Sequence, residues 1–264
     1  VVGVSALATD RGGDLYVGSS DGTGTMFLSK YTAAGSRTWR RSASGNGIFI
    51  VPKGIATDPS GNVYLAASDY DDCCLWNKLL KYSPGGQQLV NKEIGVSGVD
   101  LELDDVVVSG GALYLAGTFH SSWDYNPDVP DRVDGLLIKL SLGGGEQWRR
   151  VFGTPGYDSV NDLAADPSGG LYLTGFTTGN LGGVAPARRD AFLRKYGSSG
   201  QTLWTKQIGS AGDDYGYAVA AYSSGELYLV GEAGGALKGT RHRGGQDGFV
   251  RRTDGQGNRV WTDQ

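Results

Sequence analysis

The stretch DAFLRKYGSSGQTLWTKQIG, residues 190–209, decides the fold. It contains two short apolar runs, rich in Phe, Leu, Tyr, Trp and Ile, separated by GSSG. Such runs between glycine and serine are typical of β-strands joined by a tight hairpin. The preceding piece, DLAADPSGGLYLTG at residues 162–175, has the same form around a Pro-Ser-Gly turn. Together the two pieces predict a four-stranded antiparallel meander, whose strands are named A to D in chain order.

This unit of about fifty residues occurs five times along the chain. Each copy has a tyrosine in strand B and a basic residue in strand C, and four copies have a tryptophan in strand D. These markers are Tyr16, Tyr64, Tyr114, Tyr172 and Tyr228; Lys30, Lys81, Lys139, Lys195 and Arg252; and Trp39, Trp148, Trp204 and Trp261.

One such unit cannot bury both of its faces, but units stacked radially cover one another. We therefore predict an all-β, five-bladed β-propeller of four-stranded antiparallel meander blades. It forms a single domain over residues 1–264, with blades at approximately 1–42, 43–94, 95–152, 153–209 and 210–264. The repeated aromatic residues are expected to fill the space between blades rather than to bind a ligand. We expect a closed ring, the alternative being a piece of a longer array.

Residues 190–232 resemble the bacterial β-propeller repeat called SBBP. The fourth and fifth copies carry its pattern at Asp190, Phe192, Lys195, Gly200, Trp204, Gly209, Asp213, Asp214, Gly225 and Tyr228. The second copy departs from it with Val90 in place of tryptophan, and the third has Leu140 in place of tyrosine. The resemblance implies a propeller in a secreted or cell-surface bacterial protein. It supplies no catalytic residues, because the family has no agreed catalytic motif.

Composition excludes several partners. The formal net charge of −4 provides no basic face for nucleic acid, and the apolar runs are too short to span a membrane. The first ten residues, VVGVSALATD, already belong to the first copy and lack the regions of a signal peptide. We expect a secreted or cell-surface protein. If it has an export signal, we expect that signal to have been removed. We expect no cofactor.

The irregular parts of the repeat indicate where a site would lie. In a propeller built from meander blades, the A–B and C–D turns lie at one end of the strands and so on one face of the propeller. The B–C loops and D–A links lie on the opposite face. The B–C loops are long and differ between copies, as loops on a scaffold that carries a site do. Aromatic, acidic and sulfur-containing side chains gather in those of the second and third copies. The predicted ligand-binding residues are Tyr70, Asp71, Asp72, Cys73, Cys74, Trp76, His120, Trp123, Asp124 and Tyr125.

Two further features of these loops each have two interpretations. Cys73 and Cys74 are adjacent, so they form either a strained vicinal disulfide or two ordinary thiols. The spaced acids of DYNPDVPD, residues 124–131, either bind calcium or form a solvated loop. His120 and His242 belong to different copies, and their spacing does not predict a metal site.

No Ser-His-Asp set, P-loop or HExxH motif is present. The favoured hypothesis is therefore a non-enzymatic binding or adhesion propeller, whose glycan or protein ligand lies on the B–C and D–A loop face. The alternatives are a hydrolase or lyase acting on polysaccharides with loop acids, and a structural spacer in a larger surface protein. The sequence leaves the oligomeric state open.

Overall fold

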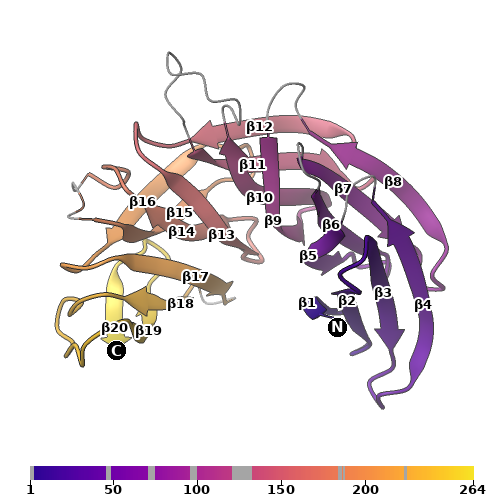
Figure 1. The fold of residues 1–264 in the computed structure, drawn as a ribbon, viewed down its shortest axis with the longest axis horizontal. Coiled ribbons are helices and arrows are strands. Elements are labelled where there is room, and N and C mark those ends of the chain that lie inside the picture. Colours follow the sequence, from indigo (N-terminus) through magenta and orange to yellow (C-terminus); the bar gives the residue numbers. More distant parts are fainter. Residues whose placement is uncertain are drawn as a thin grey trace. The chain divides into compact units, whose positions relative to one another are not determined.

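The computed structural model describes residues 3–45, 49–70, 75–95, 100–120, 133–183, 186, 188–222 and 225–264. All twenty elements in these ranges are β-strands, arranged in five four-stranded sheets (Figure 1). We call the sheets blades 1 to 5. The predicted fold class, an all-β propeller of five antiparallel four-stranded blades, is confirmed. The described part of the chain contains no apolar helix of membrane-spanning length.

The strands of each blade follow one another in chain order, so strand A is β1, β5, β9, β13 or β17. Blade 1 is β1 (Gly3–Thr9), β2 (Leu15–Ser20), β3 (Thr25–Tyr31) and β4 (Arg37–Ser44). Blade 2 is β5 (Phe49–Thr57), β6 (Val63–Tyr70), β7 (Leu75–Tyr82) and β8 (Gln88–Ile94). Blade 3 is β9 (Asp100–Ser109), β10 (Ala112–His120), β11 (Val133–Ser141) and β12 (Glu146–Phe152). Blade 4 is β13 (Asp158–Ala165), β14 (Leu171–Thr177), β15 (Asp190–Tyr196) and β16 (Thr202–Ile208). Blade 5 is β17 (Asp214–Ala221), β18 (Leu227–Ala233), β19 (Asp247–Thr253) and β20 (Arg259–Asp263).

The chain forms two compact units. Unit 1 comprises residues 1–115, 120–129 and 139–147, and unit 2 comprises 116–119, 130–138 and 148–264. Blades 1 and 2 therefore belong to unit 1, blades 4 and 5 to unit 2, and blade 3 contributes to both. Each unit has its own buried core, which in unit 1 includes Tyr16, Leu65 and Leu80, and in unit 2 includes Tyr172, Leu193 and Leu227.

The three marker residues of the repeat form one row across blades 1, 4 and 5. In blade 4, Tyr172 lies opposite Lys195, and Lys195 lies opposite Trp204. The Lys195 ammonium is 4.8 Å from the centre of the Tyr172 ring, and the Tyr172 and Trp204 ring centres are 6.1 Å apart. A cation over an aromatic face is attracted by the quadrupole of the ring. The repeat therefore preserves a packed row. The same row is Tyr16, Lys30 and Trp39 in blade 1, and Tyr64, Lys81 and Val90 in blade 2.

The A–B turns of blades 1, 2 and 4 are fixed by an aspartate that also accepts a hydrogen bond from the marker tyrosine. In blade 4, Asp166 Oδ1 accepts from the amides of Ser168 (2.8 Å) and Gly170 (2.9 Å), and Oδ2 accepts from the Tyr172 hydroxyl (2.7 Å). Burial would raise the pKa of Asp166, but these hydrogen bonds outweigh it and the pKa lies below its ordinary value. The DPSG turn thus joins hairpin geometry to the core tyrosine.

Neighbouring blades are joined where strand D meets the next C–D turn. Trp39 of blade 1 donates from Nε1 to the Pro84 carbonyl of blade 2 (2.9 Å), and Arg41 donates from Nε to the Gly86 carbonyl (2.7 Å). In unit 2, Arg150 likewise donates to the Gly200 carbonyl (3.1 Å). A tryptophan followed two residues later by a basic side chain is therefore the element that attaches one blade to the next.

Candidate functional site

Three of the ten predicted ligand-binding residues lie in the described part of the chain, namely Tyr70, Trp76 and His120. The other seven lie outside the described residues. They are Asp71, Asp72, Cys73, Cys74, Trp123, Asp124 and Tyr125. The disulfide and the calcium site rest on these segments and stay hypotheses. Among the described residues, no group of three or more His, Cys, Asp or Glu side chains is placed to hold a metal ion.

Tyr70 is part of a compact polar and aromatic group at the B–C loop face of unit 1. Its hydroxyl donates to Glu102 Oε1 at 2.6 Å, and the Lys53 ammonium donates to the same oxygen at 2.6 Å. Phe49 stacks on Tyr70, with ring centres 5.0 Å apart and planes inclined by 16°. We call Phe49, Lys53, Tyr70 and Glu102 the Tyr70 cluster. Its members come from the A strands β5 and β9 and from the end of β6.

The local fold explains why these side chains meet. Phe49 and Tyr70 lie opposite each other in the β5–β6 register. The register shifts between Pro52 and Gly54, so Lys53 is the extra residue of a β-bulge. A bulge re-aims the side chain that it carries. Here it lets the Lys53 ammonium reach Glu102, on the first strand of the next blade.

The charges in the Tyr70 cluster are fixed by this geometry. Burial would raise the pKa of Glu102, but hydrogen bonds from Lys53 and Tyr70 outweigh it, and His120 lowers the pKa further by its electrostatic interaction. Burial would lower the pKa of Lys53, but its bond to Glu102 raises it above the ordinary value. Burial and the bond to Glu102 raise the pKa of Tyr70. The cluster therefore presents a carboxylate, an ammonium and a neutral phenol at neutral pH.

Trp76 is not brought together with Tyr70. In the β6–β7 register Tyr70 is opposite Leu75, and Trp76 is opposite Asp69. Since successive residues of a strand point to opposite faces of the sheet, the Trp76 and Tyr70 side chains occupy different faces. Of the three described candidates, Tyr70 and His120 share the surroundings of Glu102, and Trp76 does not.

A second aromatic group, in unit 2, was not predicted from the sequence. Tyr217 is the bulge residue of β17, between Gly216 and Ala218. Its ring lies nearly parallel to that of Tyr215, with centres 6.1 Å apart and planes inclined by 11°. Its hydroxyl donates to Glu232 Oε2 at 2.9 Å. The sequence signal was YGY at residues 215–217, since the bulge residues of blades 1, 2 and 4 are Ser5, Lys53 and Asn161.

Arg189 and Phe176 complete this group. The Arg189 Nη1 donates to the Tyr215 hydroxyl at 2.7 Å. Its guanidinium carbon is 5.8 Å from the Tyr215 ring centre and 5.4 Å from that of Phe176. We call Phe176, Arg189, Tyr215, Tyr217 and Glu232 the Tyr217 cluster. It also lies on the B–C and D–A loop face, because Phe176 is near the end of a B strand and Tyr215 near the start of an A strand.

Two aspartates at the junctions of the D–A links with strand A have a structural role. Asp158 Oδ2 accepts from the Thr154 amide at 2.6 Å, and Asp214 Oδ2 accepts from the Ser210 amide at 2.6 Å. Both carboxylates are fully buried. Burial raises the pKa of Asp214 above its ordinary value. These aspartates therefore hold the start of strand A against the link before it.

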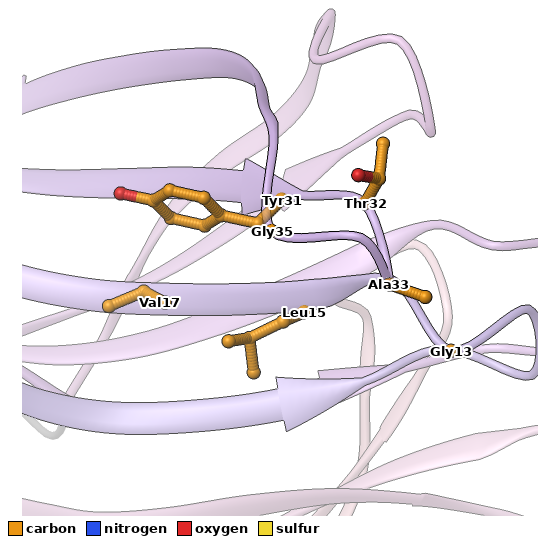
Figure 2. A pocket seen from close by; sticks show the side chains of 7 residues that line it. All are labelled: Gly13, Leu15, Val17, Tyr31, Thr32, Ala33 and Gly35. Atoms are coloured by element: carbon orange, nitrogen blue, oxygen red, sulfur yellow. The ribbon is translucent and has the colours of Figure 1, made fainter.

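A pocket of about 320 Å³ lies at the opposite end of blade 1 (Figure 2). Leu15, Val17 and Tyr31 line it, together with the turn residues Gly13, Thr32, Ala33 and Gly35. Gly35 occupies the C–D turn position that Gly86 has in blade 2. A Cβ at Gly86 would lie 3.0 Å from Trp39, whereas no described heavy atom lies within 4 Å of a Cβ at Gly35. The pocket therefore lies at the position on blade 1 that, on blade 2, is filled by Trp39 of the preceding blade.

Comparisons with known proteins agree with this architecture. The sequence model of the SBBP beta-propeller repeat matches residues 147–182. Regulatory protein FlaEY of Caulobacter vibrioides is 26% identical over 249 residues, which cover 80% of this chain. The chain spans 26% of the length of that curated relative.

Two solved structures show the same fold at low sequence identity. A protein of unknown function from Bacteroides caccae has a TM-score of 0.55 and 12% identity, covering 99% of this chain and 81% of its own. The structure of YCF48 bound to D1 peptide has a TM-score of 0.53 and 11% identity, covering 98% of this chain and 66% of its own. With the five sheets described above, these matches identify the chain as a five-bladed β-propeller that carries an SBBP beta-propeller repeat.

Proposed function

We propose that this chain is a non-enzymatic binding propeller that holds a glycan on the B–C and D–A loop face of blades 2 and 3, at the Tyr70 cluster. The observation that carries the proposal is the Glu102 carboxylate, fixed by Lys53 and Tyr70 beside a stacked aromatic pair. A sugar offers an apolar ring face for stacking and hydroxyl groups that donate and accept hydrogen bonds. Phe49, 41% exposed, supplies the ring, and Glu102 and Lys53 supply an acceptor and a donor.

The position of the cluster supports this choice. Tyr70 and His120 immediately precede residues 71–74 and 121–132, which carry the other seven predicted ligand-binding residues. A site made from rigid strand ends and variable loops is a common way for a scaffold to bind ligands. The rings and charged groups are also held in place before a ligand arrives, which reduces the entropy lost on binding.

The chemistry of the cluster favours binding over catalysis. Hydrolysis of a glycoside uses two carboxyl groups, one of which donates a proton. The Tyr70 cluster contains one carboxylate, that of Glu102. Burial would raise its pKa, but the hydrogen bonds from Lys53 and Tyr70 outweigh burial and hold the pKa below its ordinary value. Such a group is a poor proton donor at neutral pH. The Caulobacter relative is named a regulatory protein, which is in keeping with a non-enzymatic role.

We further propose that the protein acts outside the cytoplasm, in a secreted or cell-surface protein. The support is the resemblance of the repeat to SBBP propellers. Cell fractionation with an antibody against the propeller would test this, and recovery in the cytoplasm alone would contradict it.

A glycan array tests the binding proposal. Wild-type protein should bind at least one glycan, and Phe49→Ala and Glu102→Gln should each weaken that binding by about tenfold, or ~1.4 kcal/mol. Leu89→Ala is the matched control, because Leu89 is 47% exposed on the outer strand β8 and lies away from the cluster. If the wild-type protein binds no glycan on the array, the proposal that its ligand is a glycan is refuted. Unchanged binding by both variants would refute the site.

A further inference from the structure

Tyr217 combines high exposure with a fixed orientation. It is 47% exposed, yet its hydroxyl is held by Glu232 at 2.9 Å, and its ring lies nearly parallel to that of Tyr215. Burial and then the bond to Glu232 raise the pKa of Tyr217 to about 12, so the phenol remains a hydrogen-bond donor at neutral pH. An exposed tyrosine usually keeps its rotamer freedom. Here that freedom is lost before any ligand binds.

The neighbouring tyrosine is fixed from the other side. Arg189 donates to the Tyr215 hydroxyl and lies against the rings of Tyr215 and Phe176. The Phe176 and Tyr215 rings meet edge to face, with centres 5.3 Å apart. The result is a row of three rings, Phe176, Tyr215 and Tyr217, with a guanidinium at one end and a carboxylate at the other.

The polar groups at the two ends retain unused hydrogen-bonding capacity. Glu232 accepts from Tyr217 through Oε2, and Arg189 donates to Tyr215 through Nη1. Among the residues that the structure describes, Glu232 Oε1 and the Arg189 Nε and Nη2 groups have no hydrogen-bond partner. A ligand on the row therefore meets an acceptor at one end and donors at the other.

The charges of the row are balanced. Arg189 and Glu232 carry opposite charges, and nearby Arg188 faces Asp213, with 4.0 Å between their charged atoms. A ligand with net charge would gain attraction from one end and repulsion from the other. A neutral ligand with an apolar ring face and several hydroxyl groups matches both ends.

From this arrangement we propose that the Tyr217 cluster is a binding surface for a neutral oligosaccharide, which stacks a pyranose ring on Tyr217 and directs hydroxyl groups to Glu232 and Arg189. This surface is carried by blades 4 and 5 alone. It does not rest on the site proposed for the Tyr70 cluster, and either site can exist without the other.

The test is a titration with defined oligosaccharides, followed by NMR of tyrosine-labelled protein. The neutral probes are cellohexaose, xylohexaose, mannohexaose and maltohexaose, and the anionic probe is an oligogalacturonate of similar length. We expect at least one neutral probe to bind and to shift the Tyr215 and Tyr217 ring signals. Tyr217→Ala should raise the Kd about tenfold or more. Tyr217→Phe, which keeps the ring but loses the bond to Glu232, should raise it about threefold.

Two controls separate this surface from other effects. Tyr222→Ala removes a tyrosine of the same blade that is 59% exposed and lies outside the cluster, and it should leave the Kd unchanged. Phe49→Ala disables the Tyr70 cluster and should leave the Tyr217 ring shifts intact. The proposal is overturned if no neutral probe binds, if Tyr217→Ala binds as wild type, or if the oligogalacturonate binds more tightly than every neutral probe.

Discussion

Replacing Tyr172 by phenylalanine should destabilise unit 2 by about 2 kcal/mol, the usual loss for a buried hydrogen bond to a charged group. The Tyr172 side chain is fully buried, and its hydroxyl donates to Asp166 Oδ2 at 2.7 Å. The substitution removes this donor and leaves the ring in place. Asp166 keeps its two backbone amides, so the hairpin turn itself should persist.

Urea unfolding followed by tryptophan fluorescence measures this loss, because Trp204 packs near Tyr172. Tyr196→Phe is the matched control. Tyr196 is equally buried in the same blade, but its hydroxyl has no hydrogen-bond partner of normal geometry among the described residues. Its removal should be neutral or slightly stabilising. A loss in Tyr172→Phe no larger than in Tyr196→Phe would refute the role assigned to the Asp166–Tyr172 bond.

The stability difference between wild type and Tyr172→Phe should also depend on pH. The pKa of Asp166 in the folded protein is below its ordinary value of 3.8, since hydrogen bonds outweigh burial. A depressed carboxyl pKa stabilises the fold above the unfolded-state pKa, and this stability is lost as pH falls through the folded-state pKa. The difference between wild type and Tyr172→Phe should therefore be constant near neutrality and shrink below pH 3.8. A difference that grows in acid would contradict this assignment.

Three further predictions follow from other contacts. Gly200→Ala should lower the free energy of unfolding in urea by about 1–3 kcal/mol, because φ is +81° and an added Cβ would lie 3.1 Å from Trp148. Gly183→Ala is the control, since Gly183 has a similar φ and open surroundings, and it should cost less. Equal losses of stability in the two variants would contradict the packing role of Gly200. Glu102→Gln should reduce stability by about 1 kcal/mol near neutrality, a difference that disappears in acid as the wild-type carboxylate is protonated below its ordinary pKa of 4.5; no loss at pH 7 would show that the Lys53 pair contributes nothing. Intact mass of non-reduced protein isolated from an oxidising compartment should be lower by two hydrogen masses if Cys73 and Cys74 are bridged, and two alkylated thiols would rule the bridge out.

Local chemistry made the blades predictable from the sequence. The A–B turn at Asp166 needs an aspartate, a glycine and a nearby tyrosine, and all of these lie within seven consecutive residues. The Tyr172–Lys195–Trp204 row follows once the hairpins are in register, because strands of known length and turn fix which residues lie opposite one another. Five repetitions of the same short-range pattern then give five blades.

The candidate site was less predictable, because its contacts join residues far apart in the sequence. Lys53 and Glu102 are on the first strands of different blades, and neither is in a B–C loop. Tyr70 was identified from its loop, but its partners depend on a bulge that the repeat does not reveal. Trp76 was grouped with Tyr70 by proximity in sequence, and the alternation of the β6–β7 ladder places it on the other face.

The A-strand bulge explains how one scaffold supports different surfaces. Its residue is Lys53 in blade 2, Asn161 in blade 4 and Tyr217 in blade 5. Asn161 uses the position internally, donating to the Gly216 carbonyl of the next blade at 2.8 Å. Lys53 also reaches the next blade, at the Glu102 carboxylate, whereas Tyr217 donates to Glu232 of its own blade.

The backbone of the bulge therefore stays constant while its side chain changes from an internal link to part of an aromatic and charged cluster. The marker tyrosines of blades 1 to 4, by contrast, are buried in the rows that hold each blade together, so replacing them costs packing. Substituting Asn for Tyr217 should accordingly abolish the proposed sugar binding, since the ring is lost, while the urea midpoint changes by less than in Tyr172→Phe. If Tyr217→Asn unfolds the protein as readily as Tyr172→Phe, the bulge is part of the core rather than a variable position on it.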